Sequence, residues 1–221
     1  MDETGQLSYE EVRGWIRRFA GQIVANKQYL TELDSAIGDA DHGINMDRGF
    51  QAAIPKLDAL TGEDSGAACK LVGSTLISTV GGAGGPLYGS LFLQFGIALS
   101  GHSPVSLNDW LAGLGAGIAA IQRLGKAELG DKTMLDSLMP ARDALTQVLA
   151  EGTSPREALL GAAAAAEAGM KATIPIVARK GRASYLGERS AGHQDPGATS
   201  SYMLVRAAAD EWTAKDHGGE S

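Results

Sequence analysis

Cysteine, aromatic residues and basic residues are all scarce in this sequence of 221 residues. Cys69 is the single cysteine, which excludes an intramolecular disulfide framework and fits a reducing compartment. Because Cys69 stands in an apolar helical pattern, we interpret it as a small core residue and not as a nucleophile. Lysine and arginine total 19 against 26 aspartates and glutamates. The resulting net charge of −7 argues against a protein that binds nucleic acid by neutralising phosphates.

Long apolar runs are missing as well. No segment approaches the roughly 20 apolar residues of a membrane-spanning helix, and the start Met1-Asp2-Glu3 lacks the basic and apolar regions of a secretory signal. We therefore expect a cytoplasmic protein with no membrane partner. Hydrophobic residues still make up 44% of the chain, enough for a core, and we expect a single domain over residues 1–221, ordered at about 7–215.

Helical signals recur along the chain, whereas no convincing alternating strand pattern occurs. Three capping boxes mark helix starts: Ser8 with Glu11, Ser106 with Asp109, and Ser154 with Glu157. Apolar residues at helical spacing predict seven or eight helices in an all-α bundle. They run at about 9–37, 44–54 (stopped by Pro55), 66–80, 86–100 (starting at Pro86), 107–124, 134–149, 155–173 and 198–214, before a frayed end.

An acidic stretch carries the strongest chemical signal. Asp34, Asp39 and Asp41 place three carboxylates within eight residues. Close carboxylates repel one another, and a hard divalent cation removes that cost because it prefers several oxygen ligands. We expect Asp34 on the last turn of the first helix, and the other two in an extended loop where residues two apart point the same way. The alternative is a solvated acidic turn.

The type of metal is narrowed by the ligands. An EF-hand is excluded because its sixth and twelfth positions, counted from Asp39, hold Ile44 and Phe50. The cluster offers neither imidazole nor thiolate ligands, which favours Mg²⁺ or Mn²⁺ over Zn²⁺. Such sites commonly complete their coordination with substrate phosphates.

Two further segments fit a phosphate site. The run Gly81–Gly85 precedes a helix and can offer backbone N–H donors to an anion, although a close-packed turn is the alternative. Residues 179–197 show no period, and an aperiodic segment this long is usually functional or disordered. It concentrates positive charge that could face a polyphosphate or form a solvated loop; the residues are Lys180, Arg182, Arg189 and His193.

Other catalytic motifs are not supported. Gly125–Thr133 reads G-x-x-x-x-G-D-K-T, but Asp131 is inserted and the segment follows a helix, so it is not a P-loop. A nucleotide-contacting loop is left open there. No Ser-His-Asp or Cys-His arrangement stands out: His102 has no apparent partner and His217 lies in the C-terminal tail.

Five motifs resemble, in order, those of the nucleotide-binding L subunit of bacterial dihydroxyacetone kinases. They are Glu32–Met46, Gly81–Leu87, Gly125–Glu128, Gly130–Met134 and Ala178–Ala198. The similarity runs from about residue 8 to 212. It implies an up-and-down eight-helix barrel with the nucleotide site at one end.

The resemblance also implies site residues. Asp34, Asp39 and Asp41 would bind two Mg²⁺ ions that hold the phosphates of ADP or ATP. These aspartates and Arg182 would be the catalytic residues. The nucleotide would be contacted by His42, Gly43, Ile44, Asn45, Ala83, Gly84, Gly125, Thr133, Met134, Arg182, Asp195, Pro196 and Gly197. Many relatives carry serine where this chain has Gly84, which leaves only a backbone donor there.

Partners are implied in the same way. A short ketose such as dihydroxyacetone would be held on a separate K subunit. We expect ADP to stay bound as a cofactor that a phosphotransferase-system subunit rephosphorylates. The alternatives are an ATP-exchanging kinase subunit for dihydroxyacetone or erythrulose, and a nucleotide-loaded module that regulates a transcription factor. A homodimer is also open.

Overall fold

This computed structural model describes residues 1–214 of the chain. They contain nine α-helices, one 3-10 helix and one pair of short strands, joined by loops. The helices are α1 (Tyr9–Ala25), α2 (Lys27–Ile37), α3 (His42–Asp58), α4 (Ser65–Thr79), α5 (Gly84–Ala98), α6 (Leu107–Gly125), α7 (Leu135–Ala150), α8 (Pro155–Ala172), η1 (Arg182–Ser190) and α9 (Pro196–Thr213); the strands are β1 (Gln6–Leu7) and β2 (Val105–Ser106). The all-α class is confirmed. His217 and the end expected to fray lie outside the described residues.

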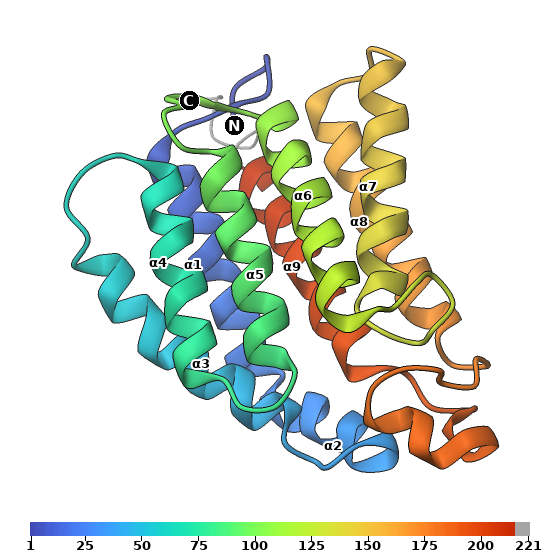
Figure 1. The fold of residues 1–221 in the computed structure, drawn as a ribbon. Helices are drawn as coiled ribbons and strands as arrows, with labels where there is room; N and C mark the ends of the chain where they lie inside the picture. Colours follow the sequence, from blue (N-terminus) through green and yellow to red (C-terminus); the bar gives the residue numbers. More distant parts are fainter. Residues whose placement is uncertain (215–221) are drawn as a thin grey trace.

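Eight of the helices close into a ring. Each of α1, α3, α4, α5, α6, α7, α8 and α9 packs against the next, and α9 returns to α1 (Figure 1). Helix α2 and η1 lie together across one end of this barrel, and the β1–β2 pair lies at the other end, near the N-terminus (Figure 1). The ring agrees with the predicted eight-helix barrel. Within residues 1–214, no helix is both long and apolar enough to cross a bilayer.

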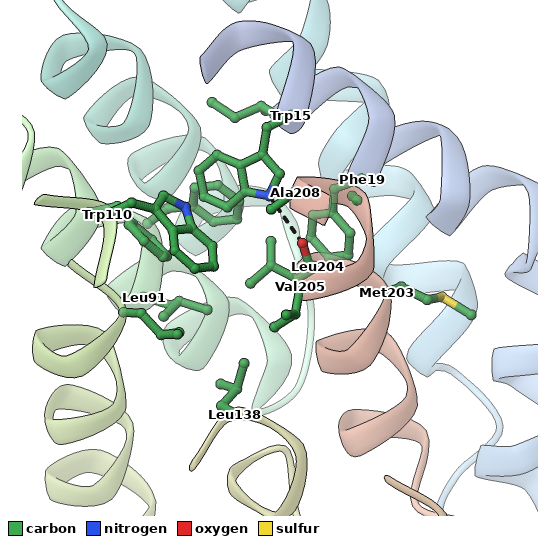
Figure 2. Close-up of a cluster of buried hydrophobic side chains, with 14 of the residues drawn as sticks. Trp15, Phe19, Leu91, Trp110, Leu138, Met203, Leu204, Val205 and Ala208 are labelled. Atoms are coloured by element: carbon green, nitrogen blue, oxygen red, sulfur yellow. Dashed lines mark hydrogen bonds between the residues drawn. The ribbon is translucent and has the colours of Figure 1, made fainter. Parts of the chain in front are cut away.

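The few aromatic residues are concentrated in the barrel core. The ring of Trp15 lies 5.1–5.8 Å from four others, and its indole N–H donates to the Leu204 carbonyl at 3.1 Å (Figure 2). The four rings belong to Phe92, Phe95, Trp110 and Trp212. Cys69 is fully buried in the same core, as expected. Edge-to-face and stacked contacts of this kind add to the free energy gained from burial.

Small residues let neighbouring helices approach closely. At Gly73 of α4 a Cβ atom would lie 2.7 Å from the Gly89 carbonyl of α5, so this crossing accepts no larger residue. The three predicted capping boxes are all formed, at the starts of α1, α6 and α8.

Helix boundaries differ from prediction at two places in the first part of the chain. The first expected helix is broken at Asn26, which ends α1 and precedes α2, because its side-chain amide donates to the Gln22 carbonyl and competes with the helix backbone. Pro55 does not stop α3, which continues to Asp58. Leu57 is fully buried, and its packing favours one more turn in spite of the missing N–H.

Other local predictions were also wrong. Residues 182–190, where the sequence shows no period, form the 3-10 helix η1, which is kinked at Gly187. A 3-10 helix has three residues per turn, so it does not produce the α-helical period in the sequence. The strands Gln6–Leu7 and Val105–Ser106 have two residues each, too few to alternate, so they do not contradict the expectation of no alternating strand pattern. Helix α5 begins at Gly84 and not at Pro86. His102 does have a partner, the Asp109 carboxylate at 2.9 Å.

Replacing Trp15 with alanine removes the centre of the aromatic core. We expect Trp15→Ala to lower the free energy of unfolding by roughly 3–5 kcal/mol, measured by urea denaturation. The matched control is Ile97→Ala on α5, where the side chain is 62% exposed and the change should stay within about 0.5 kcal/mol. Equal losses for the two variants would contradict the packing described above.

Candidate functional site

One cavity lies at the end of the barrel covered by α2 and η1, and most of the predicted site residues line it. Those that do are Asp34, Asp39, Asp41, His42, Asn45, Ala83, Gly84, Thr133, Met134, Arg182, Asp195, Pro196 and Gly197. They come from segments that are far apart in the sequence. Tertiary structure therefore brings the separate motifs to one place.

The three carboxylates form a compact cluster in this cavity. Each of Asp34, Asp39 and Asp41 offers an oxygen, and these oxygens all lie within 4.8 Å of one another. Asp34 is buried on the last turn of α2, as predicted. Its Oδ2 accepts the backbone N–H groups of Asp41 at 2.8 Å and His42 at 3.1 Å. These bonds attach the end of α2 to the start of α3.

A tight turn brings the carboxylates together. The predicted extended loop is wrong, because Ala40 has a φ of +61° and the backbone reverses there. Gly38 is equally constrained, since a Cβ atom on it would lie 1.9 Å from Asp34 Oδ1. The cluster thus depends on backbone conformations that the alternation argument did not include.

The cluster fits a hard divalent cation by its donor chemistry. Arg182 pairs with Asp39 at 3.0 Å, and one guanidinium does not balance three carboxylates. Oxygen-only donors of this kind suit Mg²⁺. Asp34, Asp39 and Asp41 are the residues that could hold it.

Four helix N-termini meet at the same cavity. His42 opens α3, Gly84 opens α5, Met134 precedes α7 and Pro196 opens α9, and all four residues line the cavity. Each N-terminus carries partial positive charge, although the His42 N–H of α3 already donates to Asp34 and the Ala198 N–H of α9 to Asp195. The cavity therefore combines a cation-binding cluster with several anion-binding helix ends.

In the glycine run 81–85 between α4 and α5, residue 84 has room for a side chain. A Cβ atom on Gly84 would meet Val80 Cγ1 at 3.4 Å and Met46 Sδ at 3.9 Å, which are ordinary contact distances. A serine would therefore fit at residue 84, and its absence leaves backbone groups to face the cavity.

Three predicted nucleotide contacts do not line the cavity. Gly43 lies against α2, where a Cβ atom would be 2.1 Å from the Lys27 carbonyl, and Ile44 is 45% exposed. A Cβ atom on Gly125 would lie 3.9 Å from Leu87 Cδ2, and it is Leu87 that lines the cavity. Contacts of these three residues with a nucleotide stay predictions.

The basic segment divides into two parts. Lys180 and Arg182 line the cavity, whereas Arg189 and His193 are exposed and do not. The predicted positive wall therefore comes from the beginning of the segment.

Sequence reasoning missed a buried polar network beside the cavity. The Tyr88 hydroxyl lies 2.6 Å from Ser200 Oγ and 3.0 Å from Ser201 Oγ, and His42 Nε2 lies 2.9 Å from Ser200 Oγ. Burial raises the pKa of the Tyr88 hydroxyl and lowers that of His42, although Asp34 and Asp41 act in the opposite direction on His42. No sequence pattern linked α5 with α9.

Apolar side chains form another missed part of the wall. They come from α2, the end of α4, α5 and η1, and are Ile37, Val80, Leu87 and Ala183. None of the four was singled out as a site residue from the sequence, because only their meeting around a cavity distinguishes them from other apolar residues.

Asp195 caps the last helix from a buried position. Its Oδ2 accepts the Ala198 N–H at 2.6 Å. Burial is the main cause that raises the pKa of Asp195 to about 7; the Ala198 N–H and Lys132 act to lower it, and the charge of Asp136 acts with burial. This carboxyl therefore titrates near neutral pH, unlike an ordinary N-cap aspartate.

Fold and cavity together define the class of this protein: an all-α barrel that has carboxylate donors for a divalent cation and helix N-termini for an anion at one end. A family model, the DAK2 domain, matches residues 36–210. The chain belongs to the DAK2 domain family.

Two bacterial relatives are similar over nearly the whole chain. The PEP-dependent dihydroxyacetone kinase, ADP-binding subunit DhaL, of Escherichia coli (strain K12) is 43% identical over 203 residues, covering 92% of this chain and 97% of that protein. The PTS-dependent dihydroxyacetone kinase, ADP-binding subunit DhaL, of Lactococcus lactis subsp. lactis (strain IL1403) is 42% identical over 198 residues, covering 90% and 95%.

A solved structure shares the fold. The dihydroxyacetone kinase from C. freundii in complex with AMP-PNP and Mg²⁺ matches with a TM-score of 0.70 and 26% identity. The match covers 90% of this chain and 33% of that chain. This chain therefore spans about a third of the length of that kinase.

The raised pKa of Asp195 predicts a pH-dependent stability difference. The pKa of an aspartate in the unfolded chain is about 3.9, whereas that of Asp195 in the folded protein is about 7. The bound proton therefore contributes its full stabilisation below about pH 3.9, and this contribution to the free energy of unfolding is lost as pH rises towards 7. Asparagine accepts the same helix-capping bond but does not titrate. We expect the stability of Asp195→Asn relative to wild type to increase between pH 4 and 7, by at most about 1.4 kcal/mol per pH unit.

The measurement is urea denaturation of both proteins in Mg²⁺-free buffer across this pH range. Asp64→Asn, which alters the exposed N-cap of α4, is the matched control. A stability difference for Asp195→Asn that stays constant from pH 4 to 8 would contradict the prediction.

Proposed function

We propose that this chain is the ADP-binding subunit of a dihydroxyacetone kinase and transfers a phosphoryl group from a Mg²⁺-bound nucleotide. The observation that carries the proposal is the meeting of three carboxylates and four helix N-termini in one cavity. The similarity to ADP-binding subunits over about nine-tenths of the chain supports the same function.

Asp34, Asp39 and Asp41 would hold two Mg²⁺ ions. When bound, these ions neutralise phosphate charge and orient the phosphates. The backbone of residues 81–84 and the starts of α5 and α9 would face the same phosphates through N–H groups. The apolar side chains of Ile37 and Leu87 offer surface for the nucleobase.

Arg182 would act on the phosphoryl group that is transferred. It pairs with Asp39 through an exposed guanidinium, and a cation bound by Asp39 would release it towards the nucleotide. There it would stabilise the charge that develops as the bond to the leaving phosphate breaks and the bond to a ketose hydroxyl forms. The hydroxyl proton would pass to a base outside this chain.

We place the ketose on a separate K subunit and assign the recharging of bound ADP to a phosphotransferase-system subunit. This assignment is supported by the names of the relatives, which are ADP-binding subunits of PEP- or PTS-dependent kinases. Kinase activity that needs this chain, a ketose-binding partner and the phosphotransferase components together would support it. Full activity with ATP alone would favour the nucleotide-exchanging alternative, and binding to a regulator without any kinase activity would favour the regulatory module.

Removing one carboxylate should abolish nucleotide retention. We expect purified wild-type protein to release close to one equivalent of ADP on denaturation. Asp39→Asn should release almost none, because the two remaining carboxylates are too few to hold Mg²⁺ and the nucleotide phosphates with it. The matched control is Asp47→Asn on α3, where the carboxylate pairs with Lys27 outside the cluster. Chromatography of the released nucleotide and calorimetry of Mg-ADP binding measure the effect. Unchanged affinity in Asp39→Asn would refute the metal assignment.

A second test separates the two arginines of η1. We expect Arg182→Ala to lower the rate of phosphoryl transfer by about a hundredfold or more, which is the usual cost of removing one transition-state donor. Arg189→Ala should leave the rate unchanged, because Arg189 is exposed and does not line the cavity. The reconstituted kinase assay reports both, and equal losses would contradict the role of Arg182.

A further inference from the structure

Lys132 is a fully buried lysine in the loop between α6 and α7. Only 1% of its surface is exposed, and its φ is +65°, a backbone conformation that favours glycine. A glycine would adopt this conformation without strain, so a lysine here must contribute through its side chain. The G-x-x-x-x-G-D-K-T segment that contains it is not a P-loop, which leaves the role of Lys132 unexplained.

The Lys132 ammonium group lies in a cage of backbone carbonyl oxygens. Four carbonyls accept from Nζ, those of Thr173 at 2.9 Å, Ile176 at 3.1 Å, Ser190 at 2.6 Å and His193 at 2.5 Å. An ammonium group has three N–H donors, so these four acceptors occupy all of them. Burial lowers the pKa of Lys132, and the nearby charge of Asp195 raises it.

The four carbonyls come from both ends of one segment. Thr173 and Ile176 follow α8, whereas Ser190 is the last residue of η1 and His193 follows it. A single cation therefore joins the beginning and the end of residues 173–193. Charged donors form the stronger hydrogen bonds, and a buried site strengthens them further.

The loop that carries Lys132 is itself held in place by hydrogen bonds. The carboxylate of Asp136, on the first turn of α7, accepts the N–H groups of Gly130 at 2.6 Å and Thr133 at 2.7 Å. The loop that carries Lys132 is thereby attached to the barrel. Through its bonds to the four carbonyls, Lys132 attaches the segment between α8 and α9 to this loop and so to the barrel.

This segment supplies the basic residues that line the cavity, and it leads to Asp195, the N-cap of α9. Lys180 and Arg182 lie between the two joined ends. Asp195 follows directly, and its N–H donates to Thr173 Oγ1 at 3.0 Å. Moving either end of the segment would displace these groups together.

A direct role on phosphate is the competing explanation, because Lys132 also lines the cavity. Its three N–H donors are already directed at carbonyl oxygens, and a phosphate could be bound only by giving up some of these bonds. The geometry therefore favours an indirect role.

We propose that Lys132 is a positioning residue of the nucleotide site: its caged ammonium group holds residues 173–193 in the conformation that brings Lys180, Arg182 and Asp195 to the cavity. The effect on nucleotide affinity rests on the function proposed above, whereas the effect on the segment does not.

The test removes the ammonium group and then returns it as a small molecule. Lys132→Ala leaves a space that matches n-propylammonium, since the missing atoms are three carbons and a nitrogen. Lys132→Met is the second variant, because it fills the space without charge. Lys171→Ala is the control, as Lys171 lies near Thr173 but is exposed and pairs only with Glu167 among its described ion pairs.

Two quantities are measured for each protein. Hydrogen exchange of the amides of residues 174–194 is followed in the nucleotide-free state, and Mg-ADP affinity is measured by calorimetry. We expect both Lys132 variants to exchange at least tenfold faster in this segment, while exchange in α4 and α5 stays unchanged, and to bind Mg-ADP at least tenfold more weakly. n-Propylammonium should restore both quantities in Lys132→Ala, whereas tetramethylammonium, which has no N–H donor, should restore neither.

The outcomes separate the explanations. Weaker binding with unchanged exchange would overturn the proposal in favour of direct phosphate contact. Faster exchange throughout the chain in both variants would overturn it in favour of a general structural role, as would equal rescue by the two amines. Wild-type protein that does not bind Mg-ADP would refute the proposed function, yet the exchange measurement would still decide whether Lys132 holds the segment.

Discussion

Repulsion among three carboxylates at one end of the barrel is the constraint on which the rest of the site depends. Asp34, Asp39 and Asp41 are held together by a turn that needs a glycine at 38 and a left-handed residue at 40. Such a cluster is stable only where positive charge compensates it. The structure supplies that charge through Arg182 and through the backbone N–H groups of Asp41 and His42 at the start of α3, and a divalent cation bound by the three carboxylates would supply the rest.

The up-and-down topology explains why these compensating groups are at hand. Alternate helices of the ring, α3, α5, α7 and α9, begin at the same end, so their dipoles add at one cavity. These helix ends add to the few basic side chains at the cavity, Lys180 and Arg182, which is consistent with the low content of lysine and arginine. The opposite end of the barrel carries the β1–β2 pair.

The aromatic core and the cavity make different demands on the same helices. Trp15 and its neighbouring rings fix how the helices of the ring pack, and α9 contributes Leu204 to that core while its first turn lines the cavity. A buried network from His42 through Ser200 to Tyr88 links the two regions. Lys132 provides a comparable link on the other side, between the α6–α7 loop and the segment before α9. The cavity wall is thus rigid where helices form it and depends on specific polar contacts where loops form it.

Local signals were enough for much of the prediction. Capping boxes and apolar periodicity depend on residues three or four apart, so the starts of α1, α6 and α8, the all-α class and the place of Asp34 at a helix end could all be read from the chain. Short motifs in a fixed order were likewise enough to indicate the family and to select most residues that line the cavity.

Most failures arose where distant contacts overrule local preference, as where burial of Leu57 carried α3 past a proline. The division of α1 from α2 is different, because it comes from a local bond of Asn26 to the Gln22 carbonyl that the apolar pattern does not show. Only the folded chain places Tyr88 beside Ser200, or a lysine inside carbonyls that lie more than 40 positions further along. By itself, the sequence determined the all-α class, the three capped helix starts and which carboxylates could bind a metal, because those properties are encoded by neighbouring residues. The tertiary structure alone decided which groups surround that metal site, because their positions depend on contacts between segments remote in the chain.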